Sequence, residues 1–260
     1  MSEGEPVLLR TLESGTLWLT LNRPHAKNAI DWDLRRALLR AFEEDAAHPD
    51  VRAVVVRGAG RTFCAGGDIR QMGNGPDDTR AKLDVAAGIV SAMTRLPKPI
   101  VAGIEGAVAG AGLGLAFACD IVVSSDSARF HPSFVQRGLG PDMSSSFWLT
   151  RQLGLHAAKS LLMLGRPFTP EDARRWGLVT AVWDEASFDH ELHDLASTLA
   201  GGPTVAYGHI KALIGNAAVS ELMDQMRAES EAQLALAETE DHRESIAAFQ
   251  AKRSVLFHGR

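Results

Sequence analysis

Two segments rich in glycine and alanine restrict the folds open to this chain more than any other feature. They are RGAGRTFCAGGDI, residues 57–69, and GAVAGAGLGLAFACD, residues 106–120. In each, small residues stand where an apolar strand is expected to give way to a helix, so backbone N–H groups can approach a ligand with no side chain in the way. Two such N–H groups converging on one carbonyl oxygen would form an oxyanion hole. The pattern therefore predicts strand–turn–helix units with a reaction site at the turns.

An acidic residue follows the second segment. Asp142 stands in GLGPDMSSS, just ahead of a helix predicted to start near residue 144. Asp is frequent as a helix N-cap, so capping is one interpretation. A general base is the other, because two donors and one base suffice for proton transfer next to a carbonyl. A helix N-terminus would stabilise the carboxylate, whereas apolar neighbours such as Phe134, Phe147 and Trp148 would raise its pKa. The sequence leaves both roles open.

Apolar runs and breaker residues predict an alternation of strands and helices as far as about residue 200. The expected strands are 16–24, 51–60, 100–106, 121–126 and 178–183. The expected helices are 30–48, capped by Asn28 or Asp31, then 80–96, 112–120, 144–164 and, after a Thr169 cap, 171–177. From residue 188 we predict helix, with breaks at 201–203 and around Gly215. We therefore expect an α/β core over residues 1–200 and a helical region over residues 201–260.

Composition narrows the class of protein. A net charge of −5 without a long basic run is not the footprint of a nucleic-acid-binding protein. The longest uncharged apolar segment, 107–119, is too short and too rich in glycine for a membrane span of ~20 residues. The N-terminus lacks the apolar stretch of a signal peptide. Only Cys64 and Cys119 are present, without metal-ligand spacing. We therefore expect a cytoplasmic globular protein without a metal, and no nucleic acid or membrane among its partners.

Other glycine-rich templates fit poorly. Counted from Gly110, the dinucleotide-binding pattern G-x-G-x-x-G fails because Leu115 occupies its last glycine position. No G-x-x-x-x-G-K phosphate loop is present, and no serine stands in G-x-S-x-G. A single glycine turn is usually only a tight turn in a packed core, so the functional interpretation depends on the two turns together with their flanking motifs.

Four motifs resemble the crotonase family, also called enoyl-CoA hydratase/isomerases: LNRPHAKNAI, FCAGGDI, GAVAGAGLGLAFACD and FQAKR. They occur in the expected order over nearly the whole chain. The resemblance implies an α/β fold made of a spiral of ββα units, with a C-terminal helical trimerisation region and assembly into a homotrimer or a dimer of trimers. It implies an acyl-CoA thioester substrate whose carbonyl lies in an oxyanion hole formed by the N–H groups of Gly67 and Ala111. No separate cofactor is implied, because CoA is part of the substrate.

The chain departs from this family at the positions of the two hydratase glutamates. Gly114 and Phe134 occupy them, so both acid/base carboxylates of a hydratase are missing. Asp142 instead matches the Asp of dienoyl-CoA isomerases and of the ring-1,2-epoxyphenylacetyl-CoA isomerase group, whose turn reads GL-x-PD. The resemblance therefore favours an isomerase with Asp142 as its base. An atypical enoyl-CoA hydratase or another crotonase-type lyase or hydrolase is the alternative. A non-catalytic acyl-CoA-binding subunit is the alternative from another class.

The resemblance also suggests which residues bind the substrate. Residues of NRPHAK match the segment that lines the adenine and ribose-phosphate side of CoA, and the tail of FQAKR matches residues that often reach a CoA bound by a neighbouring subunit. For individual Arg and Lys residues, a solvated helix face is the competing interpretation. Asp68 is also expected to hydrogen-bond the backbone and shape its loop. The predicted substrate-binding set is Arg23, His25, Ala26, Ala65, Gly67, Asp68, Ile69, Arg70, Ala111, Phe134, Phe249 and Lys252.

Overall fold

The computed structural model describes residues 5–255 and, apart from residues 216–221 and 228, their side chains. Its main sheet has six strands in the order β1-β2-β3-β4-β6-β8. Only β1 is antiparallel to its neighbour, and every other pair is parallel. The strands are β1 Leu8–Glu13, β2 Thr16–Leu21, β3 Ala53–Gly58, β4 Ile100–Ile104, β6 Ile121–Ser125 and β8 Ala181–Trp183. A second, parallel pair consists of β5 Ala107–Ala109 and β7 Arg129–His131.

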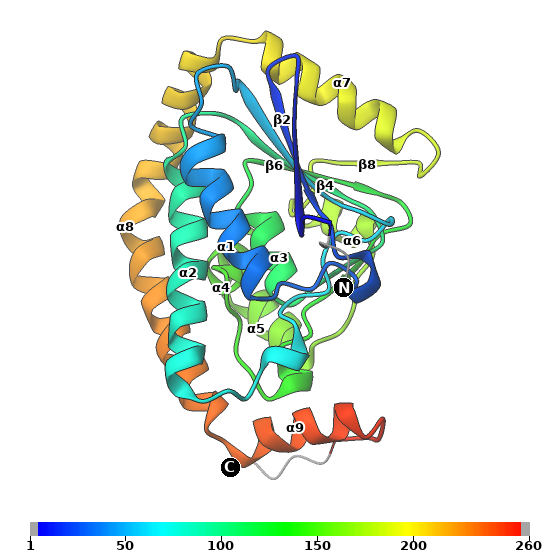
Figure 1. Ribbon diagram of the computed structural model, residues 1–260, viewed down its shortest axis with the longest axis vertical. Helices are drawn as coiled ribbons and strands as arrows, with labels where there is room; N and C mark the ends of the chain where they lie inside the picture. Colours follow the sequence, from blue (N-terminus) through cyan, green and yellow to red (C-terminus); the bar gives the residue numbers. More distant parts are fainter. Residues whose placement is uncertain (1–4, 256–260) are drawn as a thin grey trace.

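Helices cover both faces of the main sheet (Figure 1). They are α1 Trp32–Arg40, α2 Pro76–Arg95, α3 Ala111–Phe117, α4 Ser145–Leu153, α5 Leu155–Leu164, α6 Pro170–Arg175, α7 Phe188–Gly201, α8 Thr204–Ala237 and α9 Glu240–Gln250. A π-helical segment, η2 Ala41–Asp45, continues α1. Short 3-10 turns are η1 Pro24–Ala26, η3 Ile69–Gln71 and η4 Val135–Arg137. The expected α/β architecture is confirmed.

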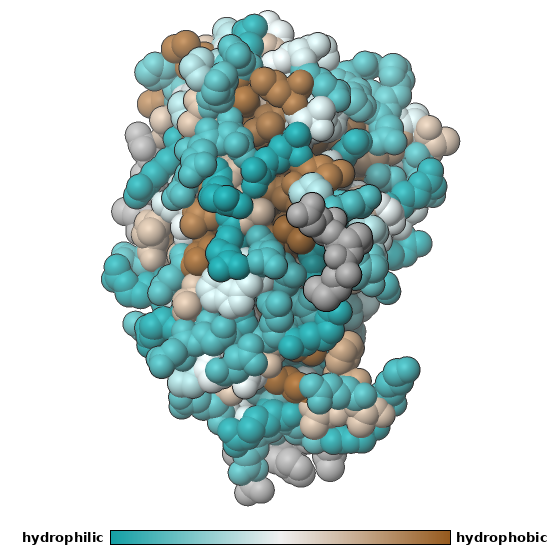
Figure 2. All heavy atoms as spheres, in the orientation of Figure 1, coloured by the Kyte–Doolittle hydropathy of each residue, from teal (hydrophilic) through white to brown (hydrophobic). Residues whose placement is uncertain are grey.

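Alternate residues of the central strands face two separate apolar layers, as a period of two requires. Val54 and Val56 belong to the larger layer, which includes residues of α1, α2 and α3. Val55 packs on the other side against Phe188 and Leu192 of α7. Because both faces are covered, β3 is an uninterrupted buried run of Val rather than an alternating one. Figure 2 shows one outer face of the molecule, where polar residues surround small apolar areas.

Most predicted elements are present, and two helix predictions need correction. The helix predicted over 144–164 is two helices, because Gly154 at φ +76° ends α4 and begins α5. The break predicted around Gly215 is wrong, since α8 runs through this residue without interruption. One glycine inside a helix costs only about 1 kcal/mol, and α8 offsets this by packing along α2 (Figure 1). Of the two caps considered for α1, Asp31 is correct, because its Oδ1 accepts from the Leu34 N–H at 2.8 Å.

The C-terminal helices pack against the core of the same chain. The helix break predicted at 201–203 is present, because α7 ends at Gly201 and α8 begins at Thr204. Helix α8 contacts α2 and α4, and α9 contacts η4. Figure 1 shows α8 along one side of the molecule and α9 beyond its lower end. No helix in the described part of the chain is both long and apolar enough to cross a membrane.

Candidate active site

The two glycine-rich turns lie side by side. Cys64 pairs with Val108 in a parallel bridge. The Cys64 N–H donates to the Ala107 carbonyl at 3.0 Å, and the Ala109 N–H donates to the Cys64 carbonyl at 2.9 Å. Gly66 has φ +94°, and a Cβ at this position would lie 2.9 Å from the carbonyl oxygen of Ala109. Glycine is therefore needed here both for its conformation and for the close approach of the two turns.

Gly67 and Ala111 each present a backbone N–H at this junction. Among the hydrogen bonds between described residues, neither N–H has an acceptor. Ala111 is the first residue of α3, so its N–H has no partner within the helix and lies at the positive end of the helix dipole. The Cβ position of Gly66 is 3.5 Å from the Ala111 nitrogen, which places the two turns within reach of one ligand atom. Two free donors in this arrangement can bind an oxygen that gains negative charge.

A cavity of about 150 Å³ opens beside these donors. An apolar cavity of similar volume holds a ligand the size of benzene. Six of the predicted site residues line it: Ala65, Gly67, Ile69, Ala111, Phe134 and Asp142. Residues of α1, α2, α8 and α9 complete its wall. The structure therefore brings the two turns, the apolar wall and the predicted base to one place.

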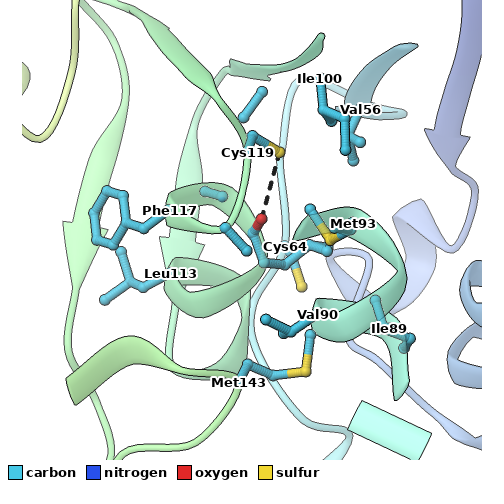
Figure 3. Close-up of a cluster of buried hydrophobic side chains, with 14 of the residues drawn as sticks. Val56, Cys64, Ile89, Val90, Met93, Ile100, Leu113, Phe117, Cys119 and Met143 are labelled. Carbon is cyan, nitrogen blue, oxygen red and sulfur yellow. Dashed lines mark hydrogen bonds between the residues drawn. The ribbon is translucent and has the colours of Figure 1, made fainter. Parts of the chain in front are cut away.

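The backbone of Asp142 is held by hydrogen bonds, while one of its two carboxylate oxygens has no partner among the described residues. The Asp142 carbonyl accepts from the N–H of Ser145 at 2.9 Å and from its hydroxyl at 2.7 Å. Oδ1 of Asp142 is closed off from solvent and has no hydrogen-bond partner among the described residues. Met143 belongs to the buried apolar core, and its side chain extends toward Val90 of α2 (Figure 3). Asp142 is thus held at the cavity, and its Oδ1 is not used in a structural hydrogen bond.

The capping interpretation of Asp142 is wrong. Ser144 is the N-cap residue of α4, and no side chain of its own completes the cap. The free N–H groups of Ser144 and Ser146 instead donate to the carboxylate of Glu229, which reaches in from α8. Sequence reasoning missed Glu229 because it lies 83 residues beyond Ser146, in a helix rich in Ala, Glu and Gln where no residue stands out.

The electrostatic environment of Asp142 suits a base near neutral pH. Burial raises the pKa of Asp142 to about 6, against the opposing effects of the positive charge of Arg35 and of its own backbone N–H. Arg35 belongs to α1, is buried and lines the same cavity. Its Nη1 donates to the Lys82 carbonyl at 3.0 Å, and its Nε has no partner among the described residues. No local signal distinguishes Arg35 in the sequence, because it stands in an amphipathic helix beside the exposed Arg36.

Neither of the two hydratase glutamate positions carries an acid, and Gly114 has no room for one. A Cβ at Gly114 would lie 2.3 Å from the carbonyl oxygen of Met143 and 2.5 Å from its Cβ. Any side chain there would displace the segment that carries Asp142. Phe134 is buried and lines the cavity as an apolar wall. Of the described residues that line the cavity, Asp142 is the only one with a carboxylate.

Several residues predicted to bind CoA lie outside the cavity. Arg23 is buried, and its guanidinium donates to the Ala29 carbonyl and pairs with Asp31 at 3.0 Å and Asp68 at 2.9 Å. Asp68 also accepts from the Arg70 backbone N–H at 3.1 Å, so the loop-shaping bond predicted for it is present. Hydrogen bonds from Arg70, ahead of that from Arg23, lower the pKa of Asp68 to about 2 despite its burial.

The exposed members of the predicted set lie around this network. His25 and Arg70 are exposed, and Ala26 is half-buried. None of Arg23, His25, Ala26, Asp68 and Arg70 lines the cavity. Arg23 stabilises the loop that carries Gly67, and its contact with CoA stays a prediction, as do those of His25, Ala26 and Arg70.

Of the two predicted tail residues, Phe249 lies near the cavity of its own chain, through a contact with the lining residue Arg137. His242 of α9 lines the cavity, and its Nδ1 is 2.9 Å from the carbonyl oxygen of Arg137. The guanidinium of Arg137, also a lining residue, lies 4.9 Å from the ring centre of Phe249. Phe249 and Lys252 are exposed and do not line the cavity. Contact between these two residues and a CoA bound by a neighbouring subunit stays a prediction.

Comparison with known proteins gives one family throughout. Residues 11–260 match the family model described as enoyl-CoA hydratase/isomerase. The chain is 33% identical over 258 residues to the 1,2-epoxyphenylacetyl-CoA isomerase of Escherichia coli, covering 97% of this chain and 98% of that one. It is 32% identical over 250 residues to a probable enoyl-CoA hydratase of Rhodobacter capsulatus, covering 96% of each. An enoyl-CoA hydratase crystal structure from Mycobacterium avium subsp. paratuberculosis matches with a TM-score of 0.90 at 32% identity, covering 97% of this chain and 98% of that one.

Proposed function

We propose that this chain, which belongs to the enoyl-CoA hydratase/isomerase family, is an acyl-CoA isomerase with Asp142 as its base. The reaction shifts a double bond or rearranges a ring through a thioester enolate. One observation carries the choice of isomerase over hydratase: Asp142 is the only carboxylate among the described residues that line the cavity. A proton shift needs a single base that gives back what it takes, whereas hydration needs a further group to hold and deprotonate water.

In this mechanism the thioester carbonyl accepts hydrogen bonds from the N–H groups of Gly67 and Ala111. These bonds strengthen as negative charge develops on the oxygen, so they favour the enolate-like transition state over the bound substrate. The Asp142 carboxylate takes a proton from a carbon near the thioester, and the C–H electron pair enters the enolate. The same carboxyl group returns the proton to another carbon, which regenerates the thioester. No cofactor is required, and CoA is present only as part of the substrate.

An atypical hydratase, or another crotonase-type lyase or hydrolase, is the competing proposal. The relatives themselves carry both kinds of name, an isomerase in Escherichia coli and a probable hydratase in Rhodobacter capsulatus. A non-catalytic acyl-CoA-binding subunit is the proposal from another class. The non-catalytic subunit fits poorly with a buried, unpartnered Oδ1 of Asp142 in the same cavity as two free N–H donors, since a purely binding protein gains nothing from the desolvation of that group.

Wild-type protein given 3-enoyl-CoA or phenylacetate-pathway CoA thioesters in D₂O is expected to isomerise them. Deuterium should enter the α- or γ-carbon whenever the protonated Asp142 exchanges its proton with D₂O before it reprotonates the bound enolate. Absorbance measures the first reaction and mass spectrometry the second, with crotonyl-CoA as the hydration control. Efficient addition of water to crotonyl-CoA would favour the hydratase. Binding without turnover or exchange would favour the non-catalytic subunit.

We also propose that the chain assembles into a homotrimer or a dimer of trimers. The first half of α8 exposes Val205, Ile210, Leu213 and Ile214, of which three are at least 74% exposed. Helix α5 exposes Leu155, Met163 and Leu164. Apolar residues gathered in this way are typical of surfaces buried between subunits. Light scattering at micromolar concentration should therefore give a multiple of three subunits, and a stable monomer would contradict the proposal. The cytoplasmic location stays a prediction.

A further inference from the structure

Helix α8 touches the segment that carries Asp142 through three polar side chains on one of its faces. Gln225, Glu229 and Gln233 follow one another at intervals of four residues, the spacing that places side chains on one helix face. Glu229 and Gln233 are both buried. Their partners lie on either side of Asp142, in residues 140–146, so α8 holds this segment at both ends.

Glu229 makes the central contacts. Its Oε2 accepts from the Ser144 N–H at 3.0 Å, and its Oε1 accepts from the Ser146 N–H at 3.1 Å. The Ser146 hydroxyl also donates to Oε1. Gln225 donates to that hydroxyl oxygen at 2.8 Å. On the other side of Asp142, Gln233 donates to the Gly140 carbonyl at 2.9 Å.

The backbone that these contacts hold is in a costly conformation. Met143 and Ser144 have φ values of +50° and +61°, in the left-handed region that L-residues rarely adopt. Such residues are strained and persist only where surrounding contacts impose their conformation. Ser144 is held by Glu229 through its N–H and by the indole N–H of Trp148, which donates to its hydroxyl at 2.9 Å. The orientation of Asp142 depends directly on this turn.

We propose that Glu229 is a positioning residue that fixes the 142–146 turn and so aims the Asp142 carboxylate at the substrate. The inference rests on the proposed function, in which Asp142 is the base. Glu229 does not touch the substrate in this scheme, because it is absent from the cavity lining. Burial raises the pKa of Glu229 to about 7, while the Ser146 hydroxyl and the two backbone N–H groups favour its carboxylate form. Burying an acid is costly, and an uncharged capping residue would be enough to stabilise the N-terminus of α4. A buried acid at this position therefore indicates a role beyond helix capping.

The test is a double-mutant cycle with Glu229→Gln and Asp142→Asn. In Glu229→Gln, the side-chain NH₂ group faces one of the two backbone N–H groups. A hydrogen bond is thereby replaced by a contact between two donors, which loosens the 142–146 turn. Displacing a reacting group by about 1 Å can cost about 10²-fold, so kcat should fall about 10- to 100-fold while KM stays within about twofold of wild type. In the Asp142→Asn background the same change should cause no further loss of proton exchange. Glu231→Gln is the matched control, since it makes the same change at an exposed position of α8.

The outcomes separate this inference from the proposed function. Loss of turnover in Asp142→Asn without loss in Glu229→Gln overturns the inference alone. An equal fold-loss from Glu229→Gln in both backgrounds also overturns it, because the effect would then not pass through Asp142. Full turnover in Asp142→Asn overturns the proposed function and the inference with it. If Glu229→Gln does not fold, Ser146→Ala replaces it, because this change removes one donor to the same carboxylate. The expected result is again a fall in kcat when Asp142 is present and no further loss in the Asp142→Asn protein.

Discussion

Asp142→Asn is expected to lower kcat by about 10²- to 10⁴-fold, the usual contribution of a positioned general base. The amide keeps the size of the side chain but cannot accept a proton at neutral pH. Because Oδ1 of Asp142 makes no hydrogen bond to the described residues and the side chain does not cap α4, folding should be little affected. Isomerisation and deuterium exchange should therefore collapse together while acyl-CoA affinity stays near that of wild type.

The matched control is Asp84→Asn, the same substitution at an exposed position of α2, which should leave turnover unchanged. Calorimetric melting of both variants checks that the fold is intact. Wild-type turnover in a folded Asp142→Asn protein would remove Asp142 from the mechanism. Loss of isomerisation with exchange retained would assign Asp142 to a later step than proton removal.

Because Asp142 is the proposed base, the activity of the wild type is expected to fall at low pH. Only the carboxylate form accepts a proton, and burial raises the pKa of Asp142 to about 6. The value of kcat/KM should therefore be constant well above pH 6 and fall by about tenfold per pH unit below it. Arg35 opposes this rise in the pKa of Asp142, so Arg35→Met, which removes the positive charge, should move the acid limb to higher pH. An acid limb that stays in place would mean that another group controls it.

Ala111→Pro is expected to lower turnover by about 10²- to 10³-fold, as the loss of one oxyanion-hole donor does. The substitution removes the N–H while keeping a residue that helices accept at this position, because Ala111 is the first residue of α3. The loss should appear mainly in kcat, since the missing bond matters most when negative charge develops on the carbonyl oxygen. Gly67→Pro removes the other donor and should have an effect of the same order.

Ala111→Gly is the control for this prediction, because it keeps the N–H and should retain most of the activity. Circular dichroism must accompany the kinetics, since proline can distort a turn. A folded Ala111→Pro protein with full activity would exclude Ala111 from the hole, and the same result for Gly67→Pro would exclude Gly67. An increase in KM alone would assign the N–H to binding rather than to catalysis.

Local signals explain why much of the fold was predictable. Some signals act within a few residues and can be recognised in one stretch of sequence. Examples are the Val run of β3, the glycines after it and the Thr169 cap. The helix boundaries were less accurate, because Gly154 ends a helix through its φ while Gly215 is tolerated within one. That difference depends on packing: α8 lies along α2, and this contact outweighs the helix propensity of one residue.

At the candidate site, the two small-residue turns, the absence of acids at Gly114 and Phe134 and the presence of Asp142 could all be predicted, because they are properties of residue types at fixed spacing. The capping of α4 by Glu229 rather than Asp142, and the burial of Arg35 beside the base, become visible once the chain is folded. Folding also places Arg23 in a loop network with Asp31 and Asp68. Charged residues give the same pattern in a sequence whether they are solvated or buried, and burial and long-range partners alone fix their role.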